Sequence, residues 1–145
     1  MLPRFAPLMD GVFLPANGLL HLMKKRMVGF DNRSGFAFGD TLLAMYELPG
    51  EEKPVPKACA IVSSGTFNQQ RSEVVVMAIA VQPRPDASSG EIAVLQPEAA
   101  GLEKGSAFKP VLATVPQRLV RLILGHLGDD DRQQLRHLLD LFLGD

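Results

Sequence analysis

The spacing of apolar residues divides the chain into a strand-patterned stretch and a helical end. Short apolar runs rich in Val, Ile, Ala and Phe, broken by Gly, Pro and Asp, recur between positions 36 and 115. Runs of this kind predict strands at roughly 38–47, 58–63, 73–81, 91–95 and 109–115. The charged, proline-broken segment 50–57 and the polar segment 65–72 are expected to be loops between them.

After position 115 the apolar period changes from two to 3.6, which predicts two helices. The first would begin at Pro116, carry Leu and Val residues on one face and end at Gly128. The second, near 130–143, would be capped by Asp129 and would carry an amphipathic stripe. This stripe consists of Leu135, Leu138, Leu139 and Phe142, and it is expected to point inward.

The pattern predicts a mainly β fold with C-terminal α-helices, in the form of a small SH3-like barrel of about five strands. Residues 35–145 would form this barrel domain. Residues 1–34 look different, because Pro and Gly punctuate short apolar pieces and only 19–28 has helical spacing. We therefore expect an N-terminal extension that is partly helical.

Composition and charge narrow the class of protein. With 145 residues, 46% hydrophobic and 21% charged, the chain is expected to form a packed core. No apolar run approaches the roughly 20 residues needed to cross a bilayer, and the start lacks an uninterrupted signal-peptide core. The single cysteine, Cys59, lies in an apolar run, which is typical of a buried hydrophobe in a cytoplasmic protein. The net charge of −1 gives no overall field that would favour nucleic acid.

Motifs for metal or cofactor chemistry are missing from the sequence. There is no phosphate-binding loop, no HExxH, no Cys/His cluster with zinc spacing and no nucleophile elbow. The histidines, His21, His126 and His137, lie far apart along the chain and are expected to be structural or exposed. We expect no cofactor and no metal.

Five segments, taken in order, carry a resemblance to a known family. They are GDTLL (39–43), GEEKPVPKACAIVSSGTFN (50–68), EVVVMAIAVQ (73–82), SAFKPVLATV (106–115) and LVRLILGHLGDDDRQQLRHLLDLFLG (119–144). Together they resemble the MazF/PemK family of toxin endoribonucleases over about three-quarters of the chain. The resemblance implies an SH3-like barrel, shared with the gyrase-poisoning CcdB toxins, that forms a homodimer. It also implies metal-independent cleavage of single-stranded RNA and neutralisation by an antitoxin protein.

The resemblance also implies which residues would act. The family arginine falls on Lys57, which would contact the phosphate or act as general acid. The glutamate of the preceding loop falls on Glu52. Gln82 and Lys109 would bind RNA in the same groove.

Two positions depart from the family pattern. Lysine lacks the planar fork with which arginine grips a phosphate, and Ala80, at the position of a family threonine, has no hydrogen-bonding group. Lys57 could equally be a solvated charge beside a loop. If the protein cleaves RNA, Lys57→Ala is expected to abolish cleavage and to leave the fold intact.

The departures leave two functions open. One is a toxin-like endoribonuclease with attenuated activity. The other is a catalytically inactive interaction module on the same barrel that binds nucleic acid or an antitoxin-like peptide. A CcdB-like gyrase poison is disfavoured, because the expected terminal tryptophan is absent from this chain.

Overall fold

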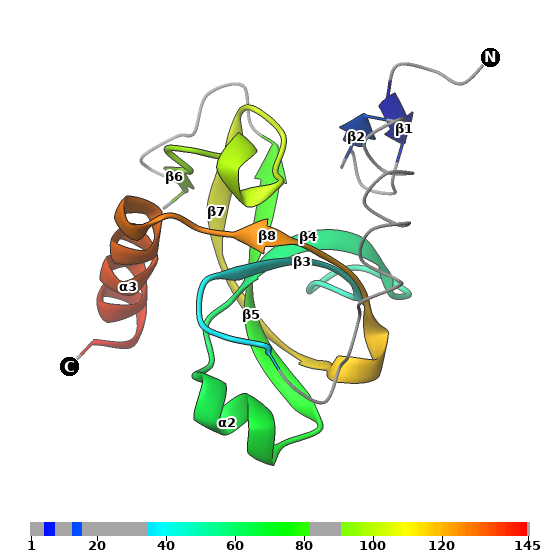
Figure 1. Ribbon diagram of the computed structural model, residues 1–145. Coiled ribbons are helices and arrows are strands. Elements are labelled where there is room, and N and C mark those ends of the chain that lie inside the picture. The colour runs from blue at the N-terminus through cyan, green and yellow to red at the C-terminus, as the bar shows by residue number, and fades with distance from the viewer. Residues whose placement is uncertain (1–4, 8–12, 16–34, 82–90, 145) are drawn as a thin grey trace.

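The computed structural model describes residues 5–7, 13–15, 35–81 and 91–144. Its main part is a six-stranded antiparallel sheet with the strand order β6-β7-β5-β4-β3-β8. The strands are β3 (Asp40–Tyr46), β4 (Val55–Ile61), β5 (Glu73–Val81), β6 (Ile92–Ala93), β7 (Ser106–Pro116) and β8 (Val120–His126). The sheet curls on itself, with helix α3 (Asp129–Leu143) on one side and the short helix α2 (Gly65–Gln70) at one end (Figure 1). The predicted class, mainly β with a barrel-like sheet and a C-terminal helix, is confirmed.

Near the N-terminus, β1 (Phe5–Pro7) pairs with β2 (Phe13–Pro15) in a separate two-stranded sheet. The helical spacing at 19–28 lies outside the described residues. In the described part of the chain, no helix has the length and apolar content that crossing a bilayer requires.

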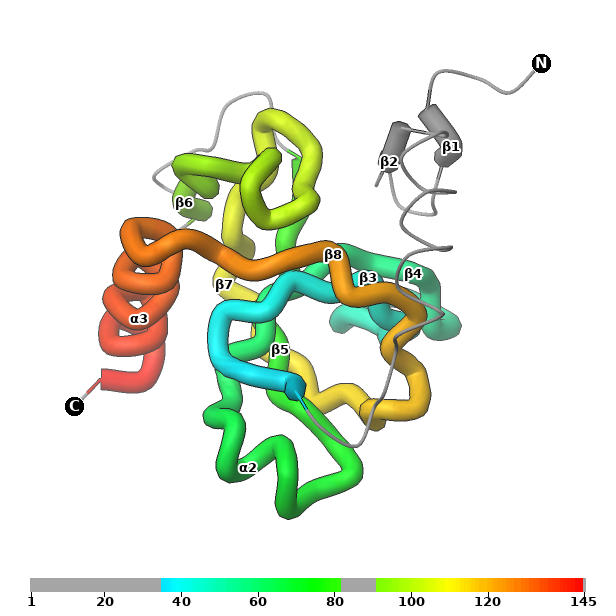
Figure 2. Tube along the Cα trace, in the orientation of Figure 1, coloured from blue at the N-terminus to red at the C-terminus, as the bar shows by residue number. Residues whose placement is uncertain are grey.

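The alternation of side chains along the strands gives the sheet two apolar faces. One face carries Leu43, Ala58 and Phe108 and is covered by Leu135 and Leu138 of α3. The other face carries Leu42, Cys59, Ile61 and other side chains from β3, β4, β5, β7 and β8. The tube in Figure 2 follows these strands around the curl, and strands far apart in sequence, such as β3 and β8, lie side by side. Because both faces are buried, strands such as β4 and β5 have continuous apolar runs in the sequence.

The prediction of a helix between Pro116 and Gly128 is wrong. The segment forms a single turn of 3₁₀ helix, η4 (Gln117–Leu119), followed by strand β8, which pairs with β3. Its leucines fit a period of 3.6, but Val120, Leu122 and Leu124 also alternate at a period of two and are all buried. Pairing with β3 supplies backbone hydrogen bonds and buries these three side chains, so the tertiary fold overrides the helical pattern.

The loops expected at 50–57 and 65–72 are also corrected. Strand β4 begins at Val55 and includes Pro56, which the sequence pattern excluded from a strand. Proline is tolerated there because β5 pairs only with Cys59–Ile61, so the first half of β4 is an edge next to β3. Residues Gly65–Gln70 form α2, whose N-cap Ser64 accepts a hydrogen bond from Phe67 N at 3.1 Å.

The terminal helix α3 begins at Asp129, one residue after its N-cap, Gly128. Leu135 and Leu138 are buried, and Leu139 is partly buried against the same cluster, as predicted. Phe142 is 38% exposed, so the inward orientation expected for it is wrong. The apolar side chains of the last turn, Leu141, Phe142 and Leu143, are all exposed.

Two glycines allow a close backbone contact that holds β8 against the 3₁₀ turn η3 (Glu98–Ala100). Gly101 has φ +72°, and a Cβ there would lie 2.2 Å from the Leu124 carbonyl oxygen. A Cβ on Gly125 would lie 2.8 Å from the Ala100 carbonyl carbon. Gly125, which would have weakened a helix, is needed because its backbone packs directly on another backbone.

Candidate functional site

Lys57 lies on β4 and is buried, with an exposed fraction of 4%. Its Nζ donates a hydrogen bond to the Tyr46 carbonyl oxygen at 2.5 Å and lies 2.6 Å from Glu51 Oε1. The same nitrogen is 5.0 Å from the centroid of the Tyr46 ring. The interpretation of Lys57 as a solvated charge is therefore wrong, because the ammonium is enclosed by a carboxylate, a carbonyl and an aromatic face.

The connection between β3 and β4 positions this pair. Tyr46 and Val55 are register partners at the end of the two strands where the connection joins them, and Ala44 lies opposite Lys57. Between the strands, a turn brings Glu51 N to the Leu48 carbonyl oxygen at 3.0 Å, and Glu51 Oε1 accepts from Leu48 N at 2.6 Å. Hydrogen bonds within this turn therefore hold the Glu51 carboxylate in place beside the Lys57 ammonium.

Glu52, the acidic residue that the resemblance assigns to the site, follows Glu51 and is exposed. The carboxylate at Lys57 is that of Glu51. The sequence contains both glutamates side by side, and only the turn geometry selects one of them. Sequence reasoning also missed Tyr46, whose carbonyl and ring both contact Lys57.

The sheet register relates Lys57 to Ala80. The β4–β5 ladder pairs Cys59 with Ala78, and two more residues along this register would bring Lys57 opposite Ala80, although the ladder ends at Cys59. Ala80 is partly exposed and contributes only a methyl group. The two positions at which this chain departs from the family pattern are thus on adjacent strands and the same face.

The structure describes one of the two residues that are expected to bind RNA. Lys109 is partly exposed and follows Phe108 on β7, where the pairing with β5 is irregular. Gln82 lies outside the described residues.

Cys59 and Tyr46, two further titratable groups near Lys57, are poor catalysts at neutral pH. Burial raises the pKa of the Cys59 thiol to about 12, and Cys59 is completely buried, as the sequence predicts. Burial also raises the pKa of Tyr46 above its ordinary value. Both groups remain protonated, so neither can serve as a nucleophile or base there.

Of the two histidines that the structure describes, His126 has a defined acidic partner. Its Nδ1 pairs with Asp40 Oδ1, and the second oxygen of this buried carboxylate accepts a hydrogen bond from Ala37 N at 2.9 Å. The imidazole itself is largely exposed, and His126 lies on β8 rather than on the helix expected there. Within the described ranges, no three His, Cys, Asp or Glu side chains are grouped so that they could hold a metal ion.

Comparison with known proteins identifies the fold. No protein-family model matches the chain, and no curated protein sequence matches it. Solved structures do match: MazF from Deinococcus radiodurans aligns with a TM-score of 0.59 at 15% identity, over 77% of this chain and 98% of that one. An endoribonuclease from a mycobacterial species aligns with a TM-score of 0.57 at 17% identity, over 77% of this chain and 94% of that one.

A third match is a mycobacterial endoribonuclease in complex with its cognate antitoxin, with a TM-score of 0.57 at 17% identity. It covers 74% of this chain and 94% of that one. The chain is therefore a small, curled β-barrel protein closed by a C-terminal helix. Its particular form of that barrel is the MazF-like fold, as the sequence resemblance predicts.

Proposed function

We propose that this protein is a MazF-type toxin with an attenuated, metal-independent endoribonuclease activity on single-stranded RNA. The observation that carries the proposal is the place of Lys57: it lies on β4 of a MazF-like barrel, where its ammonium is held by Glu51 at 2.6 Å. A basic group stays at the position that the family resemblance assigns to catalysis, but a neighbouring carboxylate restrains it.

The chemistry is attack of a ribose 2′-OH on the adjacent phosphorus. It needs a group that takes the 2′ proton, a group that protonates the leaving 5′ oxygen, and positive charge near the phosphorane oxygens. Lys57 supplies the charge and the proton for the leaving oxygen. Glu52, exposed at the neighbouring turn, is our candidate for the proton acceptor. Lys109 and Gln82 are assigned to contacts with the RNA.

The restraint on Lys57 explains why we expect the activity to be attenuated. To reach a phosphate, the ammonium must leave the Glu51 carboxylate and the Tyr46 carbonyl. Loss of the contact with Glu51 alone, a charge-assisted hydrogen bond, costs about 2 kcal/mol, which lowers the rate roughly 30-fold. The methyl group of Ala80 offers no hydrogen bond that would offset this cost.

A cleavage assay with purified protein tests the proposal, using an unstructured single-stranded RNA with and without EDTA. We expect slow cleavage that EDTA does not change and that a 2′-deoxy substitution at the scissile nucleotide abolishes. Glu51→Gln should raise the rate, because it releases the ammonium, and Lys57→Met should abolish cleavage. Lys53→Met is the matched control, since Lys53 is an exposed lysine on the same turn.

A second function is favoured by the same burial of Lys57 together with Ala80: a non-catalytic module that binds RNA or an antitoxin-like peptide. Suppose that neither the wild type nor Glu51→Gln cuts RNA while both remain folded and bind it. The protein is then a non-catalytic binding module and not an endoribonuclease. Cleavage by Lys57→Met would instead move the chemistry away from β4.

We also propose an antitoxin protein as partner and a homodimer as the assembly. One structural neighbour is an endoribonuclease bound to its cognate antitoxin, which supports the first. Apolar side chains left exposed at the end of α3, Leu141 at 65% and Leu143 at 68%, support the second. Light scattering at tens of micromolar that shows a 15.8 kDa monomer would exclude the homodimer.

A further inference from the structure

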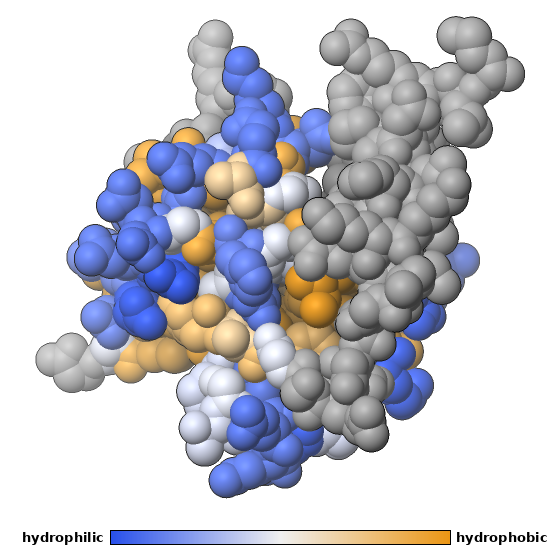
Figure 3. All heavy atoms as spheres, viewed as in Figure 1, coloured by the Kyte–Doolittle hydropathy of each residue, from blue (hydrophilic) through white to orange (hydrophobic). Residues whose placement is uncertain are grey.

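A cavity of about 420 Å³ opens at the α2 end of the molecule. It is lined by Asn68 and Gln69 of α2, by Arg71 and Ser72 that follow the helix, and by 116–118 at the corner of β7 and η4. Figure 3 shows hydrophilic and near-neutral residues gathered at this end of the molecule. The volume is in the range of pockets that enclose a small ligand.

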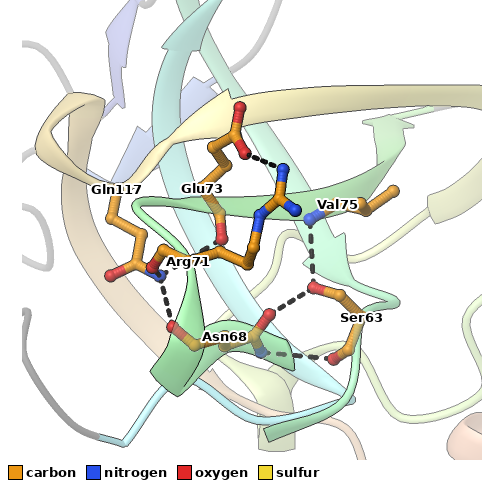
Figure 4. Close-up of polar contacts among 6 residues, drawn as sticks. All are labelled: Ser63, Asn68, Arg71, Glu73, Val75 and Gln117. Atoms are coloured by element: carbon orange, nitrogen blue, oxygen red, sulfur yellow. Dashed lines mark hydrogen bonds and ion pairs between the residues drawn. The ribbon is translucent and has the colours of Figure 1, made fainter. Parts of the chain in front are cut away.

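Buried amide side chains hold the walls of the cavity in place. Gln117 is 9% exposed, and its Nε2 donates to the carbonyl oxygens of Asn68 at 2.8 Å, Arg71 at 3.1 Å and Glu73 at 3.2 Å. Figure 4 shows this nitrogen directed at the α2–β5 connection, with the amide oxygen of Gln117 turned away from it. The corner of β7 is therefore tied to the α2 wall, and little ordering is needed when a ligand binds.

A second network fixes α2 itself. Asn68 Nδ2 donates to the carbonyl oxygens of Phe36 at 3.0 Å and Ser63 at 3.2 Å. Ser63 Oγ donates to Asn68 Oδ1 at 2.5 Å and accepts from Val75 N at 3.0 Å (Figure 4). The Asn68 side chain is thus engaged in hydrogen bonds within the fold. The exposed Gln69 and Ser72 are the polar lining residues that can adjust to a ligand.

The charged residues that line the cavity are basic. Two exposed arginines, Arg71 and Arg118, stand on its two walls, and none of its lining residues is acidic. Arg71 pairs with Glu73 at 2.9 Å, with the Arg71 side chain 55% and the Glu73 side chain 34% exposed. Because solvent screens this pair, it contributes little free energy. The five donors of a guanidinium leave Arg71 able to bind an anion as well.

We propose that this cavity binds one nucleotide of single-stranded RNA. The guanidinium groups of Arg71 and Arg118 would contact its phosphate, and Gln69 and Ser72 would face the polar edge of its base. A pocket walled by amides and guanidinium groups suits a base turned out of a single strand. An extended acidic peptide would instead require a groove or a strand edge.

The cavity is separate from Lys57. Lys57 is near the start of β4, whereas α2 follows the end of that strand, so roughly 20 Å of extended chain lies between them. The inference rests on the proposed function in one respect: the bound nucleotide would belong to the single-stranded RNA that the protein is proposed to cleave. A strand bound at both places would be held at several nucleotides, which would fix its position relative to Lys57.

Binding of a fluorescein-labelled 2′-O-methyl RNA nonamer, followed by anisotropy, tests the proposal, because this RNA cannot be cut and the result is independent of catalysis. We expect Arg71→Ala with Arg118→Ala to weaken binding at least tenfold. The slope of log K against log salt should fall by about 0.7 for each lost phosphate contact. Arg121→Ala is the control, since Arg121 is exposed on β8, carries the same charge and lies outside the cavity lining.

Gln69→Ala, which removes no charge, should weaken nonamer binding without changing the salt slope. AMP and UMP should compete with the nonamer better than inorganic phosphate does, because the base is part of the site. Equal affinity of the double variant and Arg121→Ala would overturn the proposal. So would an acidic peptide that displaces the nonamer from the wild type but not from the double variant. Loss of cleavage in Lys57→Met with nonamer binding intact would leave it standing.

Discussion

The Nζ of Lys57 lies 2.6 Å from Glu51 Oε1, and their side chains are only 5% and 22% exposed. The pair closes the turn between β3 and β4 at the position that the MazF resemblance assigns to catalysis. Removing one partner of such a pair leaves the other charged and poorly solvated, which costs more than the pair itself contributes. The pair therefore links the stability of the barrel to the availability of Lys57.

Lys57→Ala should destabilise the protein by about 3 kcal/mol, because it leaves the Glu51 carboxylate unpaired and opens space beside Tyr46. Urea unfolding followed by circular dichroism measures the loss. Glu52→Ala, at an exposed residue of the same turn, should change stability by less than about 0.5 kcal/mol. This reverses the sequence-based expectation that Lys57→Ala leaves the fold intact, and equal urea midpoints for the two variants would argue against the pair.

Cys59 should be unreactive in the native protein. It is completely buried, and burial raises its pKa to about 12, so the thiolate is scarce at pH 8. A thiol reagent such as DTNB should label less than one-tenth of the protein at pH 8 in buffer. In guanidinium it should label one thiol per chain, since the chain has a single cysteine. Rapid labelling of the folded protein would contradict the packing of Cys59 between β3 and β5.

Asp131 should anchor α3 to the segment that follows β6. It is 1% exposed, and its two carboxylate oxygens accept from Leu95 N at 2.7 Å and Gln96 N at 2.9 Å. Asp131→Ala leaves both amides without this acceptor and should cost about 3 kcal/mol in thermal or urea unfolding. Asp130→Ala is the matched control, because Asp130 is an exposed aspartate in the same helical turn. Similar losses for the two variants would show that only the helix dipole matters.

Leu135 should dominate the docking of α3 on the sheet. Its side chain is completely buried, whereas Leu141, on the same helix, is 65% exposed. Leu135→Ala should cost about 3 kcal/mol through lost burial and a residual cavity, and Leu141→Ala should be close to neutral in the monomer. If Leu141→Ala destabilises only at high protein concentration, the exposed end of α3 lies in the homodimer interface.

Local sequence determined the elements whose pattern admits one interpretation. The continuous apolar run at 73–81 predicts β5, and the spacing of Leu135 and Leu138 predicts the buried face of α3. Between 119 and 127, apolar residues satisfy both periods. Pairing with β3, which lies almost eighty positions earlier, decides in favour of a strand.

Only the tertiary structure decided the contacts of the candidate sites. Glu51 and Glu52 are equivalent in the sequence, and the turn that fixes Glu51 at Leu48 selects the partner of Lys57. The cavity that we propose as a nucleotide site joins the α2 end of the chain to 116–118, because β5 and β7 pair side by side and bring Glu73 opposite Pro116. A local sequence pattern indicates which face of a helix or strand is buried. Which charged or polar groups meet there depends on hydrogen bonds between strands that are distant in sequence.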